Sequence, residues 1–223
     1  MKLTYLGHSA FKIVTNNGIT ILIDPYVDKN PLAPIKAKHL QADYIVLTHA
    51  HGDHLGDAFS IANMNNTVFI CVSELASYVA KKGYKVHAMQ IGGAFTYDFG
   101  KLRLTMALHG SMTPDGLYGG LAAGVILEVD GVTIYHCGDT GIFGDMKMIG
   151  EMFKINYLLV PIGGNYTMDI DDAVLAVKMI TPDIAIPMHY NTFPAIIANP
   201  EEFVKKLEAE GLLGMVMQPG EEM

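Results

Sequence analysis

Short apolar segments separated by polar turns dominate the first part of the chain, and this pattern predicts strands. The apolar segments at residues 11–14 and 19–23 flank Asn17-Gly18, a dipeptide that favours the two-residue turn of a β-hairpin. Residues 44–47 form an unbroken apolar run, which is typical of a strand buried on both faces. We expect further strands at residues 2–6, 68–71, 102–108, 124–129 and 132–136, with Asp130-Gly131 as a second hairpin turn.

Helix signals lie between and after these strands. Ser73 is predicted to cap a helix that runs through Lys82 and stops at Gly83. Asn199-Pro200 has the residue types that open a helix, and Gly211 the type that follows one. The other elements expected in the C-terminal part are a strand at 157–160, a helix at 171–180 and a strand at 184–186. No stretch resembles an interdomain linker, so we expect one domain over residues 1–223.

Two parts of the chain resemble each other. Residues 18–21 (Gly-Ile-Thr-Ile) lead to Asp24, and residues 131–134 (Gly-Val-Thr-Ile) lead to Asp139. Each acidic residue is followed by an apolar strand that ends in a polar loop. The sequence therefore indicates two similar half-sheets packed face to face, each with helices over its outer face. The alternative is that such hairpins recur through composition alone.

Composition and charge narrow the class of protein. Half of the 223 residues are hydrophobic and 17% are charged, which is typical of a soluble globular protein. The net charge of −8 and the lack of a Lys/Arg cluster argue against nucleic acid as a partner and favour a small-molecule substrate. Two cysteines are too few for a disulfide scaffold. Without a signal-peptide pattern or a membrane-length apolar run, we expect a cytoplasmic protein with no membrane partner. Its oligomeric state, including a homo-oligomer, stays open.

The densest candidate chemistry lies in residues 48–57, which read THAHGDHLGD. His49 and His51 follow an apolar strand, and the alternation of a strand points both side chains the same way. Asp53 and His54 then fall in a turn or at the start of a helix, where they can face a second ion. Imidazole together with carboxylate suits zinc, iron, manganese or nickel. A histidine-rich loop without a ligand is the alternative, and four donors in six residues argue against it.

One loop cannot complete two coordination spheres, so further ligands are expected downstream. His109, Asp139 and His189 each follow an apolar strand of the predicted sheets. Side chains at this position, where a strand gives way to a loop, commonly form binding sites. We therefore predict that these three residues converge on the first motif.

The ordered set His49-x-His51-x-Asp53-His54, His109, Asp139 and His189 resembles the metallo-β-lactamase superfamily over nearly the whole chain. Residues 5–9 (YLGHS), 161–168 (PIGGNYTM) and 189–193 (HYNTF) are similar to a small branch of metal-dependent hydrolases related to L-ascorbate-6-phosphate lactonase-like proteins. The resemblance implies an α+β fold, a four-layer αββα sandwich of two similar half-sheets face to face. It also implies a dinuclear metal site at one edge of the sheets.

The resemblance further implies roles for the candidate residues. The implied ligands are His49, His51 and His109 for the first ion, Asp53, His54 and His189 for the second, and Asp139 as the bridge between them. Zinc is the expected metal, with Mn, Fe or Ni as alternatives. A hydroxide bridging the two ions would cleave a small ester, lactone or phosphodiester. Asp139 or His8 would assist the proton transfer.

Three further residues are candidates for the surroundings of the metals. Asp24 is expected to accept the free N–H of a ligating histidine, although it also fits an ordinary turn before Pro25. His8 is a candidate second-sphere residue, a proton donor or a core histidine. Asn191 is expected to support the site or to bind substrate, or else to serve only its loop. The small-residue segment 110–123 is a candidate flexible cover.

Two other functions compete with hydrolysis. A di-iron redox protein of the same fold is one alternative, but such relatives carry Glu where His51 stands, together with a flavin domain that this chain lacks. A metal-binding protein without catalysis is the other.

Overall fold

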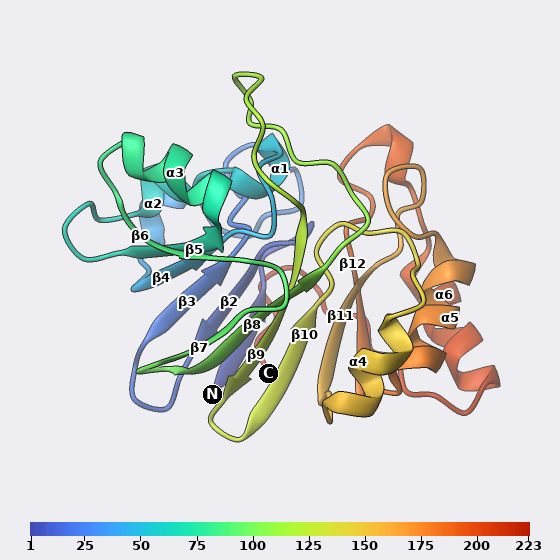
Figure 1. Ribbon diagram of the computed structural model, residues 1–223. Coiled ribbons are helices and arrows are strands. Elements are labelled where there is room, and N and C mark those ends of the chain that lie inside the picture. The colour runs from blue at the N-terminus through green and yellow to red at the C-terminus, as the bar shows by residue number, and fades with distance from the viewer.

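Two mixed six-stranded sheets form the centre of the molecule, described here for residues 1–223 by a computed structural model (Figure 1). The first sheet begins with antiparallel strands and continues with parallel ones. Its strands, in both chain order and spatial order, are β1 (Lys2–Tyr5), β2 (Phe11–Val14), β3 (Thr20–Ile23), β4 (Tyr44–Val46), β5 (Val68–Val72) and β6 (Lys85–Met89).

The second sheet repeats this plan. Its first four strands are antiparallel, and its last pairings are parallel. The strands are β7 (Ala94–Tyr97), β8 (Gly100–Met106), β9 (Ala123–Val129), β10 (Val132–His136), β11 (Tyr157–Pro161) and β12 (Ile184–Met188). In each half a hairpin, β2–β3 or β9–β10, leads to a parallel strand, β4 or β11. The two halves are therefore as similar as the sequence indicated.

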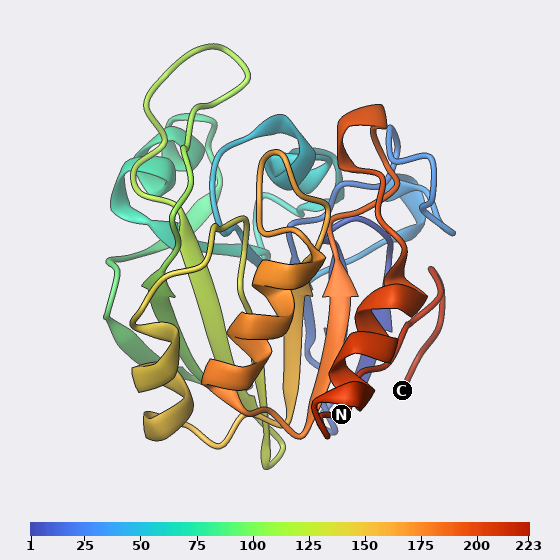
Figure 2. The same ribbon diagram turned by 90° about the vertical axis from the view of Figure 1, so that its right-hand side faces the viewer.

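Helices cover the outer faces of both sheets (Figures 1 and 2). The longer helices are α3 (Ser73–Lys81) on the first sheet, and α4 (Met146–Met152), α5 (Ile170–Ile180) and α6 (Pro200–Ala209) on the second. Short helical turns complete the set: α1 (Gly52–Leu55), α2 (Ala58–Ile61), η1 (Ala37–His39) and η2 (Pro194–Ile196). The predicted α+β, four-layer αββα sandwich is confirmed. None of these helices has the length and apolar character needed to cross a membrane.

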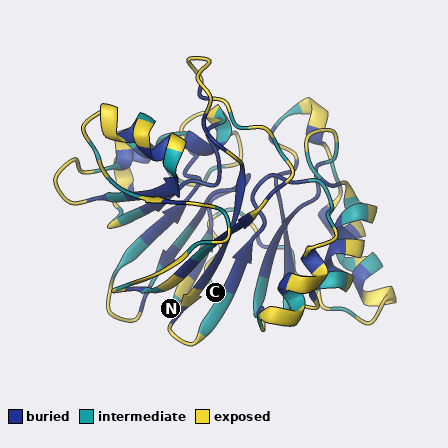
Figure 3. Ribbon diagram, viewed as in Figure 1, coloured by how far each residue is buried: buried dark blue, intermediate teal, exposed yellow.

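The inner faces of the two sheets share one hydrophobic core (Figure 3). A single cluster of 58 buried residues includes side chains from both sheets and from the helices on either side. Burial of apolar area stabilises the fold by about 25 cal/mol per Å². Because the cluster is continuous, the two halves cannot separate without exposing it to water.

Two sequence-based predictions about local structure need correction. Ser73 is not the N-cap of α3; it is the first helical residue after Val72, and its hydroxyl donates to the carbonyl of Met89 instead. By contrast, Asn199 caps α6 as predicted, because its side chain accepts from the amides of Glu201 and Glu202. Strand β8 ends at Met106, so His109 lies on a loop rather than directly at the strand end.

Six elements were not predicted: α2, α4, η1, η2, β6 and β7. The two strands lie at the edges of their sheets, and nearly all of their side chains are exposed or only partly buried. An edge strand buries few side chains, so its hydrophobic pattern is weak.

Backbone hydrogen bonds join the two halves at the loop ends of the strands. The amide of Ala123, at the start of β9, donates to the carbonyl of Thr48 after β4 (2.9 Å). The amide of His189, after β12, donates to the carbonyl of His8 after β1 (2.8 Å). These bonds fix loops from opposite sheets against each other at the edge where the candidate ligands lie.

The loop after β10 requires glycine at position 138. Gly138 has a φ of +64°, and a Cβ there would lie 2.4 Å from the carbonyl oxygen of Ala123. The backbone at this point passes directly beneath β9 before it delivers Asp139. Gly131, in the β9–β10 hairpin, has a φ of +79° but open space around it.

We predict that Gly138→Ala lowers the free energy of unfolding by about 3 kcal/mol or more, because backbone strain adds to a backbone clash. Gly131→Ala is the matched control and should cost only about 1 kcal/mol, the price of the positive φ alone. Urea denaturation of both variants measures the difference. Equal losses would show that the close approach at Gly138 is not a constraint.

Candidate metal centre

All seven predicted ligands lie together at one end of the two sheets. They come from four segments of the chain: residues 49–54 between β4 and the end of α1, and the loops after β8, β10 and β12. The first motif is placed by the turn after β4: the amides of His54 and Leu55 both donate to the carbonyl of His51, which starts α1. Asp53 and His54 therefore project from the first turn of that helix, next to the two histidines before it.

One group consists of three histidines. The ligating atoms of His49, His51 and His109 lie within 4.8 Å of one another. Nε2 of His49 and Nδ1 of His51 are 3.0 Å apart. The ring of His109 lies edge-on to both of the other rings, at centroid distances of 5.1 Å. Three imidazole nitrogens thus lie close together, in the grouping that the family resemblance implied for the first ion.

A second group combines a carboxylate with imidazoles. Asp53, His54 and His189, together with His8, also have ligating atoms within 4.8 Å of one another. Oδ2 of Asp53 lies 4.0 Å from Nε2 of His54 and 4.0 Å from Nε2 of His189. The three residues that the sequence grouped around a second ion are therefore neighbours in space.

Asp139 lies between the two groups. Its Oδ2 is 3.0 Å from Nε2 of His189 and 3.6 Å from Nε2 of His109, and its Oδ1 is 3.3 Å from Nε2 of His54. The residue is only 2% exposed. One buried carboxylate therefore faces histidines of both groups, which is the arrangement expected of a bridge.

Asp24 orients both groups from behind. Its Oδ2 accepts from Nδ1 of His54 (2.7 Å) and from the hydroxyl of Thr48 (2.5 Å), and its Oδ1 accepts from the amide of Thr48. Because the Thr48 hydroxyl donates to Asp24, it accepts from Nδ1 of His49 (3.0 Å). Both histidines are thereby held in the tautomer that leaves Nε2 with a free lone pair facing the centre. Asp24 lies where a second-sphere carboxylate is expected.

His8 is buried and both of its ring nitrogens are engaged. Nε2 is 3.2 Å from Oδ2 of Asp53, and Nδ1 is 2.6 Å from the hydroxyl of Thr192. Burial lowers the pKa of His8 to about 4. A neutral imidazole with both ring nitrogens in hydrogen bonds is poorly placed to give a proton to a leaving group. The geometry therefore favours an orienting role for His8.

Asn191 does not touch any of the predicted ligands. Its exposed side chain accepts from the amide of Ala198 (3.0 Å) and closes the loop that follows β12. The support expected of Asn191 toward the metals is therefore not what the structure shows. The side chain organises residues 191–198 instead.

Two threonines at the site were missed by sequence reasoning. Thr48 joins Asp24 to His49, and Thr140 accepts the amide of Leu108 (2.9 Å), which holds the His109 loop beside Asp139. Threonine is common in strands and loops, so neither residue carried a signal.

Backbone strain also collects here. Four non-glycine residues at the site have positive φ: His8, Asp24, His189 and Asn191, at +44° to +60°. Such strain persists only where the surrounding structure enforces it, and it was not visible in the sequence.

The electrostatics of the centre separate its histidines. Burial lowers the pKa values of His49, His51 and His109, so these three imidazoles are neutral near pH 7. Burial also opposes charge on His54, but Asp139 and Asp24 raise its pKa above the ordinary value. Without a cation, His54 thus also carries a proton on Nε2 and balances part of the carboxylate charge that surrounds it; a cation bound at Nε2 would take the place of that proton.

The donor set fits divalent cations. Several buried atoms at the centre have no hydrogen-bond partner in the protein: Nε2 of His54, Oδ1 of Asp139, and both ring nitrogens of His189. Buried polar atoms are rarely left without a partner. No lysine or arginine lies beside the carboxylates of Asp53 and Asp139; their basic neighbours are histidines alone. Cations coordinated by these nitrogens and oxygens would satisfy the atoms and balance the charge.

A family model matches the part of the chain that contains this centre, and the match identifies the family. Residues 19–190 match the model of a family described as "Beta-lactamase superfamily domain", and the match includes all seven predicted ligands. This chain belongs to the beta-lactamase superfamily. The resemblance to its metal-dependent members that the motif indicated is thereby confirmed.

Several similar proteins match this chain over nearly its whole length. A "UPF0173 metal-dependent hydrolase" of Anoxybacillus flavithermus is 47% identical over 225 residues, covering 99% of this chain and 98% of the relative. A second protein of that description, from a Geobacillus species, is 48% identical with the same coverage. Among solved structures, "Igni18, a novel metallo hydrolase" from the archaeon Ignicoccus hospitalis is 41% identical with a TM-score of 0.89, covering 100% of this chain and 97% of that one.

The lowered histidine pKa values predict how stability depends on pH in protein freed of metal. A histidine whose folded pKa lies below its unfolded value near 6.5 binds fewer protons in the folded state, so acid favours unfolding. This holds for His8, His49, His51, His109 and His136. His54, with a raised pKa, acts in the opposite direction but is one group against five. Stability should therefore fall as the pH drops from 7 to 5.

Urea denaturation of chelator-treated protein at pH 7, 6 and 5 measures this effect. We expect the free energy of unfolding to fall by about 1 kcal/mol or more across the range. His39→Ala, which removes an exposed histidine outside the centre, should show the same slope. A free energy that is constant or rises toward pH 5 would contradict the assignment of neutral buried imidazoles.

Proposed function

We propose that this protein is a metal-dependent hydrolase with two divalent cations at its centre. His49, His51 and His109 would hold one cation, and Asp53, His54 and His189 the other. Asp139 would contact both. The observation that carries the proposal is the position of the Asp139 carboxylate, buried between two converging donor groups and within 3.6 Å of histidines from each. The similar proteins are described as metal-dependent hydrolases, which supports the same activity for this chain.

Two bound cations would supply a nucleophile from water at neutral pH and would polarise the bond to be cleaved. The protein's own residues prepare the site for this chemistry. Asp24 and Thr48 fix the tautomers of His54 and His49, and His8 holds the Asp53 carboxylate in place. The low exposure of these groups strengthens each electrostatic interaction at the centre.

Zinc is the metal that we propose, with Mn, Fe or Ni as alternatives. Five imidazoles and two carboxylates beside one another form a borderline donor set, which suits these ions better than Ca²⁺ or Mg²⁺. The substrate would be a small molecule with an ester, lactone or phosphodiester bond. A di-iron redox protein and a metal-binding protein without catalysis are the competing functions. Elemental analysis and turnover measurements separate all three.

We predict that His51→Ala abolishes tight binding of one cation and lowers kcat/KM by about a thousandfold or more, because the three-histidine group loses a ligand. The side chain is only half-buried, so the fold should persist. Elemental analysis of protein purified without added metal, circular dichroism, and hydrolysis of a lactone and bis(p-nitrophenyl) phosphate measure these effects. His39→Ala is the control and should behave like the wild type.

Retention of two cations by folded His51→Ala protein would contradict the ligand assignment. Two cations in the wild type without turnover of any substrate would instead favour the non-catalytic function.

A second prediction concerns His8 as a positioning residue. His8→Ala should weaken the more weakly held cation by about 10–100-fold, because residues that orient a ligand contribute that much to metal affinity. His8→Gln keeps an N–H that can donate to Asp53 and should recover part of the loss. Competition with a chromogenic chelator measures both affinities, and the pH profile of kcat should keep its shape. Loss of a single limb of that profile in His8→Ala, with unchanged metal affinity, would show that His8 is the proton donor after all.

A further inference from the structure

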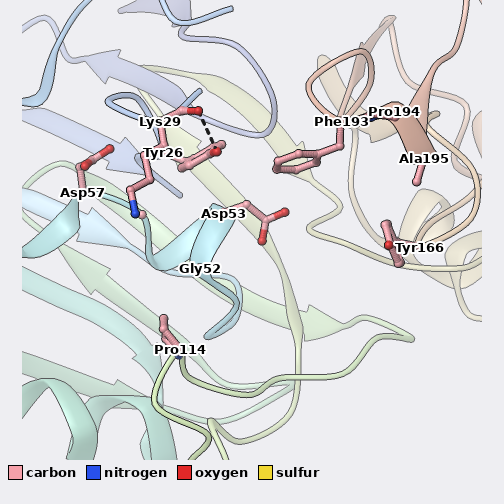
Figure 4. Close-up of a pocket in the computed structure, with 11 residues that line it drawn as sticks. Tyr26, Lys29, Gly52, Asp53, Asp57, Pro114, Tyr166, Phe193, Pro194 and Ala195 are labelled. Atoms are coloured by element: carbon pink, nitrogen blue, oxygen red, sulfur yellow. Dashed lines mark hydrogen bonds between the residues drawn. The ribbon is translucent and has the colours of Figure 1, made fainter. Parts of the chain in front are cut away.

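A cavity of about 860 Å³ opens beside the second donor group (Figure 4). Asp53 is one of the residues that line it, and its carboxylate projects into the space between the loops. The walls come from four other segments: the loop after β3, the loop between β8 and β9, the loop after β11, and the loop after β12. A cavity of this volume accommodates a ligand of drug-like size.

One wall of the cavity is aromatic and rigidly held. The rings of Tyr26 and Phe193 lie 6.3 Å apart, and both pack edge-on against the ring of His8. The Tyr26 hydroxyl donates to the carbonyl of Lys29 (3.0 Å), so its polar end is occupied. This wall therefore presents ring surface rather than hydrogen-bonding groups, directly next to the candidate metal centre.

The opposite wall is also largely apolar. Tyr166 and Ala195 lie across the cavity from Tyr26, and Pro114 and Pro194 are also among the lining residues (Figure 4). Apart from the Tyr166 hydroxyl, their contribution is again ring and methyl surface. The cavity is thus largely apolar on two sides, and Asp53 of the candidate metal centre lines it.

Few charges line the cavity. Apart from Asp53, the lining carboxylate is that of Asp57, whose Oδ2 already accepts the amides of Val27 and Asp28 (both 2.8 Å). Lys29 is the one cationic side chain among the lining residues, and it is exposed. A polyanionic ligand would need more cations, and a sugar would need several free hydrogen-bonding groups.

We propose that this cavity binds the apolar part, alkyl or aryl, of an uncharged carboxylic ester or lactone whose carbonyl lies next to Asp53. The proposal rests on the proposed hydrolase function and names its substrate class. In the reaction the acyl C–O bond breaks and the oxygen of water joins the acyl carbon. One proton of the water goes to the alcohol oxygen and the other to the solvent, so that a carboxylate remains. The alcohol leaves if the substrate is an ester and stays attached to the acid if it is a lactone. The alkyl or aryl group stays against Phe193 and Tyr26 while the carbonyl reacts.

A series of p-nitrophenyl esters tests the proposal with zinc-loaded protein. From acetate through butyrate to hexanoate, kcat/KM should rise about twofold per added methylene, and so roughly tenfold to twentyfold over the four, because each methylene leaves water for the apolar walls on two sides of the cavity. The leaving group is constant, so the slope reports only the acyl chain. A flat or falling series would overturn the proposal.

Phe193→Ala removes the aromatic wall without touching a predicted ligand. It should lower kcat/KM for the hexanoate ester by about tenfold and flatten the series, while the zinc content is unchanged. Phe95→Ala is the matched control, because Phe95 is 47% exposed on the edge strand β7 and does not line the cavity. A slope that persists in Phe193→Ala would place the acyl chain elsewhere and overturn the proposal.

Product binding keeps the test independent of turnover. Isothermal titration of zinc-loaded protein with hexanoate and acetate compares two anions that differ only in their tails. Hexanoate should bind about tenfold more tightly than acetate, and this ratio should vanish in Phe193→Ala. If no ester is hydrolysed, the proposed ester hydrolysis is wrong. The ratio of the hexanoate and acetate affinities then shows by itself whether the cavity binds apolar groups. Equal affinities in the wild type would overturn it.

Discussion

The balance of charge among buried carboxylates and imidazoles is the constraint on which the rest of the structure depends. Asp24 and Asp139 are buried and Asp53 is partly so, and the side chains of the opposite type beside them are histidines. Buried charge is costly unless it is paired and hydrogen-bonded. The fold meets this cost at Asp24 with the N–H of His54 and the hydroxyl of Thr48, and the proposed cations would complete the balance at Asp53 and Asp139. A stability cost is therefore accepted at the same place that gives the protein its chemistry.

The architecture explains how such a cluster can be held. Each half of the molecule contributes loops from the same end of its sheet, and backbone bonds from Ala123 to Thr48 and from His189 to His8 tie the halves together there. Strained backbone at His8, Asp24 and His189 is enforced by this joint. The shared hydrophobic core behind the loops keeps the two half-sites in register, so that one carboxylate, Asp139, can face both groups.

Polarity changes sharply between the centre and the cavity beside it. The centre is made of imidazole nitrogens and carboxylate oxygens, several of them without a partner in the protein, whereas the cavity walls are formed by the rings of Tyr26, Phe193 and Tyr166. His8 belongs to both, since it bonds to Asp53 on one side and packs against Tyr26 and Phe193 with its ring. Binding of an apolar group against those rings would thus be linked directly to the residue that positions a candidate ligand. The proposed substrate class follows from this juxtaposition.

Local pattern alone determined much of this protein. Alternating and unbroken apolar runs predicted most strands and the two-sheet sandwich, because burial in a sheet leaves a period of two or a continuous run in the sequence. The segment His49 to His54 predicted metal binding, because four donors in six residues are neighbours whatever the tertiary structure. The edge strands β6 and β7 bury too few side chains to leave a strand pattern in the sequence, so they were not predicted.

Only the tertiary structure decided which distant side chains meet. Contacts between residues far apart in the chain depend on how loops close, and a single threonine or tyrosine carries no periodic signal. Thr48, Thr140 and Thr192 acquired roles at the centre in this way, Asn191 turned out to serve its own loop, and the pairing of Tyr26 with Phe193 formed the cavity wall.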